Sequence, residues 1–472
     1  MAAQLEPDPD CPSCTSLAAE LQALRKVVEK LSGEVERLKA RKPKTSRTSS
    51  KPPSTDGPWT KRFSKKKPSG KKRGGQPGHK GVQRKPAPPE DVNQSNDVLL
   101  ESCRKCSSRM VRTGATPLHH QVIDIPPVKP RIDEWLLHVS QCTGCGSTER
   151  ASLPAGVHPS SFGPNLSALV VLLSGEYRMS RRNIQRYIAD AHGVEISLGA
   201  ISNIERRMTN GLEDAHTEAL AAVQESPTKH LDETTWRQEG KLAWLWAAVG
   251  QTAVCFLIRD SRRAEVAKEL IGEEPTGILI SDRYAGYSFV GLDQRQVCLA
   301  HLLRDFQRMA EGEKELRWIS DGLLLAMNDI FRLWHRHRSE DESERISRAE
   351  LRRWSQPLRT RVLKLLDEGA LNRGHETPAM CRGILRTEPS MWTFIHHEGI
   401  EPTNNVVERT VRPGVILRKT SLGSQSDRGS RFVERMQTAS ATLKLTGRSL
   451  RDFVLDVAHH VLAGAAAPAL LK

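Results

Sequence analysis

The sequence has no hydrophobic run long enough to cross a membrane. Its longest apolar stretch near the C-terminus covers residues 461–471, which is far shorter than the ~20 residues that a spanning helix needs. Its first ten residues lack both the basic and the apolar segment of a secretory signal. With 27% charged and 38% hydrophobic residues and a mean hydropathy of −0.49, the 472-residue chain fits neither a membrane protein nor a largely disordered one. We expect a cytoplasmic protein of about three domains that binds no membrane.

Acidic and aliphatic residues are scarce between positions 39 and 85. This segment holds 17 Lys or Arg and a single acid, Asp56, so it carries the whole net charge of +15 and leaves the rest of the chain near neutral. It is rich in Pro, Gly, Ser and Thr and cannot offset the entropy of ordering by burying apolar surface. We interpret residues 40–95 as a disordered basic arm that binds nucleic-acid phosphates, with Lys71, Lys72 and Arg73 among its contacts. The alternative is a linker that only keeps the chain soluble.

Ahead of the arm, apolar residues recur with the 3.5-residue period of a coiled coil. The pattern spans about three heptads and is weakened by Gly33. It predicts a short self-association helix over residues 15–39, and hence a homo-oligomer. The alternative is an amphipathic helix that packs on its own domain. The residues of the pattern are Leu17, Leu21, Leu24, Val28, Leu31, Val35 and Leu38.

Six of the nine cysteines form three Cys-x-x-Cys pairs. Without an export signal, this grouping indicates metal binding rather than disulfides. Two pairs supply four thiolates, which suits tetrahedral zinc. Strand-like runs at 121–127 and 135–140 between them predict a zinc ribbon over residues 96–150, with chance pairing and a redox role as alternatives. We favour free thiols for Cys11 and Cys14. The predicted zinc ligands are Cys103, Cys106, Cys142 and Cys145.

Residues 160–225 show a helical pattern that is interrupted by a turn at residues 192–194. A helix over 181–191, this turn, and a second helix that Ser197 can cap match a helix-turn-helix. Its arginines are placed to meet a DNA backbone. Many helical hairpins share this spacing and only pack, so that alternative stays open.

The pattern changes to strands at Lys229. Runs at 229–234, 242–249 and 253–258 predict three consecutive strands, residues 262–271 a helix, and runs at 277–282 and 295–300 two more buried strands. This is the element order of an α/β ribonuclease H-like fold. We expect this catalytic domain over residues 228–310 and 395–450, with a helical insertion at 311–394 and a C-terminal helix at 451–472.

Three acids on separate elements are placed to hold divalent metal. Asp232 follows an apolar strand run, Asp282 ends another, and Glu408 lies on a helix that Thr403 or Asn404 can cap. Carboxylates of this kind suit two Mg²⁺ (or Mn²⁺) ions, which keep the phosphate of a substrate as a further ligand. The alternative for each Asp is a turn or capping role.

Two further residues near this set have two interpretations each. Glu233 is the nearest alternative to Asp232 as a metal-binding acid. Alternation along the strand places the two side chains on opposite faces. His301 lies about one turn into the helix after Cys298, where it can touch the metal site or the substrate. We favour a buried structural histidine for this position.

Five motifs together resemble the transposases of insertion-sequence family sixty-six. The resemblance covers nearly the whole chain and departs at Leu299, where a Trp is expected after the Cys. It implies an Asp-Asp-Glu catalytic domain whose acids are Asp232, Asp282 and Glu408, and it includes an Arg-Lys-x-Ser-x-Gly stretch at 418–423. The motifs are Gly74-Gly-Gln-Pro-Gly-His-Lys-Gly81, His230-Leu-Asp-Glu-Thr-x-Trp236, Ser281-Asp-Arg-Tyr-x-x-Tyr287, Cys298-Leu-Ala-His-Leu-Leu-Arg-Asp-Phe306 and Pro402-Thr-Asn-Asn-x-x-Glu-Arg-x-x-Arg-Pro413.

The resemblance implies a nucleoid-associated DNA transposase that binds terminal inverted repeats, cleaves DNA with metal-activated water and joins the 3′-hydroxyl to target DNA. Accessory proteins of the same element are further candidate partners. Phosphate contacts are expected at Arg409, Arg412, Arg418 and Lys419, unless these side chains only cover apolar surface. Two alternatives remain: a catalytically silent DNA-binding regulator, and a ribonuclease H-like nuclease without strand transfer. The presence of all three acids argues against the first.

Deletion of residues 39–85 tests the basic arm. We expect weaker affinity for all DNA sequences alike and a flatter dependence of affinity on salt, because phosphate contacts release counterions and carry no base information. Binding titrations on specific and random duplexes at several salt concentrations measure both. A deletion that abolished sequence discrimination but spared nonspecific affinity would contradict the assignment.

Overall fold

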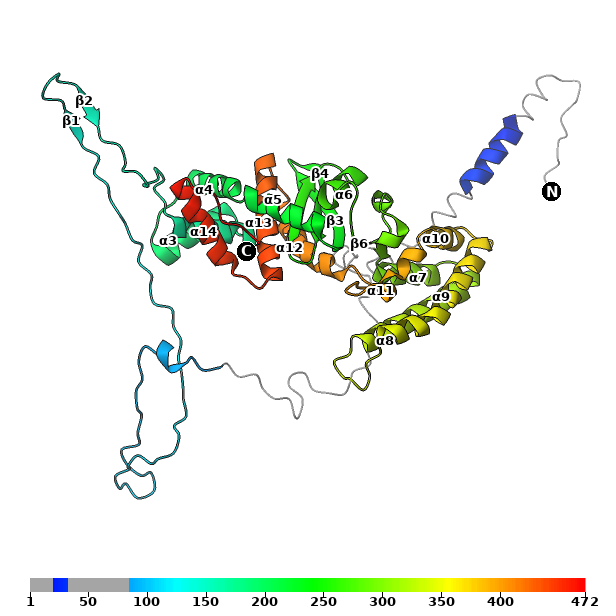
Figure 1. The fold of residues 1–472 in the computed structure, drawn as a ribbon, viewed down its shortest axis with the longest axis horizontal. Coiled ribbons are helices and arrows are strands. Elements are labelled where there is room, and N and C mark those ends of the chain that lie inside the picture. Colours follow the sequence, from blue (N-terminus) through cyan, green and yellow to red (C-terminus); the bar gives the residue numbers. More distant parts are fainter. Residues whose placement is uncertain (1–19, 33–84, 472) are drawn as a thin grey trace, which may run out of the picture. The chain divides into compact units, whose positions relative to one another are not determined.

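The computed structural model describes residues 20–32 and 85–471 (Figure 1). They divide into two compact units, which we describe separately: residues 85–133 with 187–195, and the rest. Most of the predicted basic arm, including Lys71, Lys72 and Arg73, lies outside the described residues, as do Cys11 and Cys14. Within the described part, no helix is long and apolar enough to cross a membrane.

The first described segment is a helix over residues 20–32, inside the predicted coiled coil. Its apolar side chains are more than half exposed, with Leu24 and Val28 at 58% each. Both interpretations of the apolar stripe, self-association and packing on its own domain, stay open. The helix itself is confirmed, and its pairing with a second copy stays a prediction.

Residues 96–150 contain less regular structure than the sequence predicts. An antiparallel hairpin is formed by β1 (Val139–Gln141) and β2 (Thr148–Arg150). The prediction of a strand at 121–127 is wrong: Val122 and Ile125 are more than 80% exposed, and no strand pairs with this run. The run at 135–140 becomes a strand only at Val139. Consecutive prolines at 126 and 127 remove two backbone donors, and an unpaired strand has no partner for its remaining backbone groups.

The helical pattern that begins near residue 160 is confirmed. Ser197 caps the second predicted helix, since its side chain accepts a hydrogen bond from the Ala200 amide at 3.1 Å. Gly193 makes the preceding turn with a φ of 65°, a left-handed conformation that glycine adopts without strain. The helices are α2 (Pro164–Val171), which continues into a π-helical turn (Leu172–Glu176), α3 (Arg181–His192), α4 (Leu198–Gly211) and α5 (Glu213–Glu225).

A five-stranded mixed sheet follows, in the spatial order β5-β4-β3-β6-β7. The first three strands form an antiparallel meander, and β6 and β7 run parallel to β3. The three strands, the helix and the two strands predicted from the sequence are thereby confirmed in order. Their bounds are β3 (Thr228–Gln238), β4 (Lys241–Val249), β5 (Val254–Arg259), α6 (Ala264–Ile271), β6 (Ile278–Ser281) and β7 (Arg295–Val297).

Strand β3 extends further than predicted and β7 ends earlier. Asp232 lies within β3, as the predicted strand over 229–234 has it, and the strand continues to Gln238 because β4 pairs with it along the whole hairpin. The parallel pairing with β6 ends at His230. Beyond that point β6 no longer pairs with β3, and the Leu231 carbonyl next to Asp232 accepts a hydrogen bond from the Asn404 side chain instead. The run expected as a strand to residue 300 turns into a helix after Cys298, which is the N-cap of that helix.

The rest of the chain is helical, as predicted. Helices α8 and α9 are the longest and pack side by side with α7 and α10 (Figure 1). The bounds are α7 (Leu299–Glu311), α8 (Arg317–His337), α9 (Arg348–Leu371), α10 (Glu376–Leu385), α11 (Thr393–His396), α12 (Asn405–Ser421), α13 (Asp427–Leu445) and α14 (Leu450–Ala463). Short 3₁₀ helices lie at Pro89–Asp91, Ala285–Tyr287, Leu292–Gln294, Lys314–Leu316 and Pro389–Met391.

Two apolar cores cover different parts of the sheet. Val407 and Val411 of α12 pack on one face of β3, β4 and β5, against Trp236, Leu245 and other buried side chains of those strands. The second core joins β6 and β7 to the helices α7–α11. Helix α12 therefore lies directly over the strand that carries Asp232 (Figure 1).

Gly423 is required where the chain leaves α12 and returns to β3. Its φ is 95°, and a Cβ at this position would lie 2.0 Å from the carbonyl oxygen of Arg237. The next residue, Ser424, donates its amide to that oxygen and accepts the amide of Glu239, both at 2.9 Å. Its hydroxyl accepts the indole N–H of Trp236 at 3.0 Å. A side chain at residue 423 would break this connection.

Gly423→Ala should lower the free energy of unfolding by about 3 kcal/mol, because left-handed strain adds to a backbone clash. Gly399→Ala is the matched control: its φ is 76°, and nothing lies within 4 Å of the added Cβ. We expect it to cost only the strain, about 1–2 kcal/mol. Denaturant unfolding of the two variants measures the difference, and equal losses would contradict the clash.

Candidate active site

The three predicted acids lie on three separate elements, and the charges of Asp282 and Glu408 both act on Asp232. Asp232 lies in β3, Asp282 directly follows β6, and Glu408 lies in the first turn of α12. Burial raises the pKa of Asp232 well above its usual range, and the negative charges of Glu233, Asp282 and Glu408 raise it further. Asp232 accepts the Glu233 amide at 3.0 Å and Asp282 accepts the Tyr284 amide at 2.8 Å, so both carboxylates are held by local backbone.

Asn404 places the start of α12 on the sheet. It is the N-cap residue, but its side chain makes no capping hydrogen bond. Its amide group instead contacts β3, with Nδ2 donating to the Leu231 carbonyl at 2.8 Å and Oδ1 lying 3.0 Å from Nδ1 of His230. Instead of capping the helix, the Asn404 side chain therefore hydrogen-bonds α12 to β3, and each of these two elements carries a predicted acid.

Glu408 faces the start of α7. Its Oε1 lies 3.7 Å from Nδ1 of His301, and its Oε2 lies 3.7 Å from the Arg304 guanidinium. Burial, and then the charge of Arg304, lower the pKa of His301, so its imidazole is neutral near pH 7. Glu408 Oε1 and His301 Nδ1 are both buried, and neither has a hydrogen-bond partner among the described residues.

The closest grouping of potential metal ligands differs from the predicted one. In the part of the chain that the structure describes, ligand atoms within 4.8 Å of one another come from Cys298, His301 and Glu408. That group does not include Asp232 or Asp282. The structure thus places His301 beside a predicted catalytic acid rather than in the apolar core.

Glu233 belongs to a separate buried network. Its carboxylate accepts hydrogen bonds from the Tyr287 hydroxyl and from Arg262, whose Nε lies at 2.7 Å. The Arg262 guanidinium also stacks over the rings of Trp244 and Tyr284, at 4.9 and 4.0 Å from their centroids. Glu233 therefore already has cationic and phenolic partners, which Asp232 lacks.

The basic residues of α12 fall into two groups. Arg409 and Arg412 are exposed and three residues apart, so they share a face of the helix. Arg418 instead donates to the backbone and side chain of Thr235 and to Thr234 Oγ1, and burial lowers its pKa. Lys419 is exposed and has a partner of its own. Arg418 therefore ties the end of α12 to β3.

The four predicted zinc ligands form two knuckles of nearly identical geometry. The amides of Cys103 and Cys142 each donate at 2.8 Å to the carbonyl five residues later. Hydrogen bonds from Ser147, and then from Cys142, lower the pKa of Cys145 to about 7, and bonds from Ser108 lower the pKa of Cys106 in the same way. A thiol that ionises near neutral pH suits metal binding. The two pairs lie in different compact units, so the four-cysteine site stays a prediction.

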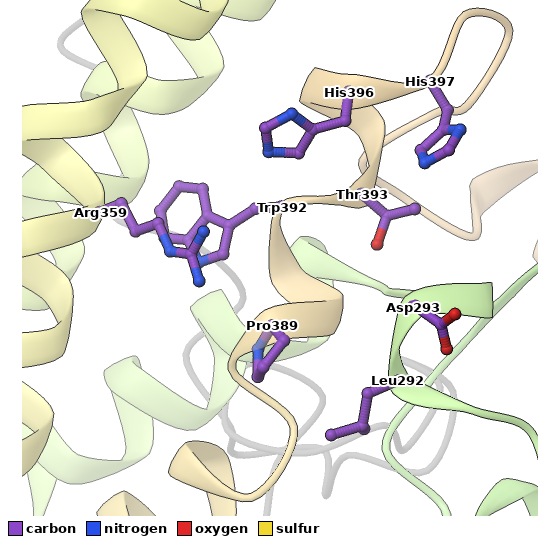
Figure 2. A pocket seen from close by; sticks show the side chains of 8 residues that line it. All are labelled: Leu292, Asp293, Arg359, Pro389, Trp392, Thr393, His396 and His397. Carbon is purple, nitrogen blue, oxygen red and sulfur yellow. The ribbon is translucent and has the colours of Figure 1, made fainter.

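Two cavities of the sheet domain are not lined by the acids. One of about 430 Å³ opens beside residues that precede β7, and Arg359 and Trp392 are among the side chains that line it (Figure 2). The indole N–H of Trp392 and the guanidinium of Arg359 both donate to the carboxylate of Glu388. Another, of about 500 Å³, adjoins the starts of β3 and β6. Ligands of open α/β sheets bind at the carboxyl ends of the strands, where Asp282 lies. The first cavity is lined by Leu292, Asp293, Arg359, Pro389, Trp392, Thr393, His396 and His397.

Sequence reasoning missed the roles of Asn404 and Arg304. Arg304 lies three residues after His301 on α7, so helical spacing alone places both on one face. The bond from Asn404 to β3 spans 174 residues of sequence, and no local pattern indicates it.

A family model described as "Transposase IS66 family" matches residues 159–432, which is more than half of the chain. The matched range begins before α2 and ends within α13, so it includes all three predicted acids. A second model, described as a family of unknown function, matches residues 6–85.

Two similar proteins come from Sinorhizobium fredii (strain NBRC 101917 / NGR234). Uncharacterized protein y4qI is 28% identical over 308 residues, which are 59% of this chain and 55% of that protein. Uncharacterized protein y4jD is 22% identical over 406 residues, which are 78% of this chain and 77% of that protein. The chain thus spans about half the length of the first relative, and neither name assigns a function.

The raised pKa of Asp232 predicts a pH-dependent stability. A carboxyl whose pKa is higher in the folded than in the unfolded chain contributes stability below the unfolded pKa, and that contribution is lost as pH rises through the folded pKa. Asp232→Asn has no charge to bury. In chelator-treated protein it should therefore raise the melting temperature by a few degrees at neutral pH and have little effect at acidic pH. Melting curves of both proteins across pH measure this, and a constant difference would contradict it.

Proposed function

Because the chain belongs to the IS66 family of transposases, we propose that it is a DNA transposase that binds the ends of an insertion sequence, cleaves DNA and joins the freed 3′-hydroxyl to target DNA. The observation that carries this proposal is that Asp282 and Glu408, on two other elements, are near enough to Asp232 for their charges to act on it. Burial is the largest cause of the raised pKa of Asp232, and the charges of Glu233, Asp282 and Glu408 add to it. A protein retains such an arrangement at a cost in stability, which a functional site explains.

The sheet supports a ribonuclease H-like assignment for the catalytic domain. Its order of β5-β4-β3-β6-β7, with an antiparallel meander followed by two strands parallel to β3, matches the element order expected for that fold. Asp232 and Asp282 come from β3 and the end of its parallel neighbour β6. The helices between α7 and α12 are then the insertion that precedes Glu408.

The donor set suits Mg²⁺ or Mn²⁺. Three carboxylates offer the oxygen ligands that these cations prefer, and Glu408 Oε1 is buried without a hydrogen-bond partner among the described residues. When bound, the cations activate water and offset the charge that develops on the transferred phosphate. His301 and Cys298 are softer ligands that suit zinc, so the assignment of Mg²⁺ rests on the acids.

The exposed arginines of α12 support a phosphate-binding role beside the acids. Arg409 and Arg412 project from the helix that carries Glu408, so a DNA strand at the acids would pass close to both. We assign phosphate contacts to these two residues and to Lys419, and a structural role to Arg418, whose guanidinium is occupied by Thr235. The basic arm, the zinc ribbon and the helices α3 and α4 are the proposed further DNA contacts.

Single substitutions of the acids test the proposal. Asp232→Asn, Asp282→Asn and Glu408→Gln keep side-chain size but remove a charge and a ligand. Each should lower cleavage and joining by at least about 100-fold, more than the loss of an outer partner of a metal ligand costs, and should leave folding and binding to element ends intact. The assay uses labelled element ends, target DNA and Mg²⁺, with circular dichroism for the fold.

Two controls separate the site from the fold. Glu388→Gln removes a buried acid that pairs with Arg359 and should retain cleavage per folded molecule. Glu233→Gln should also retain cleavage but lower the melting temperature, since Arg262 and Tyr287 lose their partner. Cleavage without joining would favour the nuclease, and binding without cleavage in the unaltered protein would favour the silent regulator. Full activity in all three acid variants would refute the mechanism.

A further inference from the structure

Asn404 is a buried polar residue whose side chain serves neither as a helix cap nor as a candidate ligand. It is 1% exposed, although it lies in a loop of the otherwise polar segment Pro402-Thr-Asn-Asn. A buried amide that is not fully bonded costs stability. Its retention at the start of α12 therefore calls for a role that a simpler capping residue could not fill.

The bonds of Asn404 join all the elements that carry the three acids. Its side chain bonds to His230 and Leu231, the two residues directly before Asp232. Its backbone amide donates to Cys298 Sγ at 3.1 Å, and Cys298 in turn donates its amide to Ser281, the residue before Asp282, at 2.8 Å. Its carbonyl accepts the amide of Glu408 at 3.3 Å.

The orientation of the amide group follows from its partners. The Leu231 carbonyl can only accept, so the atom that contacts it is the donor Nδ2. Oδ1 is then the acceptor for His230, whose Nδ1 must carry a proton. This position thus needs a donor atom and an acceptor atom at a fixed separation. Serine combines both roles in one oxygen atom, and alanine has neither.

We propose that Asn404 is a positioning residue that sets the distance between Glu408 and Asp232 for binding of a divalent cation. It touches neither substrate nor cation in this role. The loop is held from a second side as well, because the Leu299 amide donates to the Pro402 carbonyl at 2.9 Å. In this role Asn404 determines the position of the start of α12 relative to β3. Formation of the helix itself does not depend on Asn404. This inference rests on the proposed function of the three acids.

The test measures cation affinity apart from the amount of folded protein. The full chain and its variant Asn404→Ala are titrated with Mn²⁺, followed by the electron paramagnetic resonance of free Mn²⁺ and by cleavage of labelled element ends. Loss of a partner that orients a metal ligand lowers affinity by about 10- to 100-fold. We expect the Mn²⁺ concentration for half-maximal binding and cleavage to rise by that factor, and the cleavage rate at saturating Mn²⁺ to recover to within a few-fold.

A matched control separates positioning from stability. Gln296 is another fully buried amide: it donates to the carbonyls of Val297 and Met391 and accepts the amide of Phe394, none of which is a predicted ligand. Gln296→Ala should lower the melting temperature without changing the half-saturating Mn²⁺ concentration. Asn404→Ser is the second variant. Serine is also a good helix N-cap, but its side chain is one bond shorter than that of asparagine.

The outcomes distinguish this inference from the proposed function. A folded Asn404→Ser protein with unchanged half-saturation overturns the positioning role while the acids stand. Loss of the fold in both Asn404 variants identifies a purely structural residue and also overturns it. If Asp232→Asn binds Mn²⁺ as well as the unaltered chain does, the proposed metal site itself fails. A rise in half-saturation in both Asn404 variants, with none in Gln296→Ala, supports the inference.

Discussion

Helix α12 is held along strand β3 at both of its ends, and the candidate site depends on this attachment. Asn404 bonds the start of the helix to the residues before Asp232. Arg418 bonds its end to Thr235, and Ser424 then hydrogen-bonds to the turn of the β3–β4 hairpin. Between these points Val407 and Val411 pack on the sheet. Glu408 is therefore carried by a helix that is fixed to β3, and its carboxylate oxygens lie 3.7 Å from His301 and from Arg304 of α7.

Much of the fold could be predicted from residue periodicity. The alternation of apolar residues placed the strands of the sheet, and Ser197 with Gly193 located the start of α4 and the turn before it, because these signals are local. The bounds were less accurate. The predicted strand at 229–234 ends too early, since pairing with β4 extends β3 to Gln238. The run at 121–127 has strand composition but no partner to pair with.

The acids of the candidate site were named from sequence motifs and stay a prediction, and their surroundings could not be predicted. The acids lie in motifs that the sequence shows directly. The partners of Glu233 and Asn404 come from positions 29 to 174 residues away, and only the folded chain brings them together. Glu233 differs from Asp232 for this reason. Both are buried acids of β3, but Arg262 and Tyr287 donate hydrogen bonds only to Glu233.

The connectivity of the sheet has a consequence for synthesis of the protein on the ribosome. The meander β3–β5 emerges first, but the helices that cover its apolar face come after the long helical segment. The hydrogen bond from Trp236 to Ser424 spans 188 residues. At about 5–20 residues per second, α12 leaves the ribosome roughly 10–35 s after β3. During that interval the nascent sheet exposes the face that includes Trp236, and it is then a substrate for chaperones and open to aggregation.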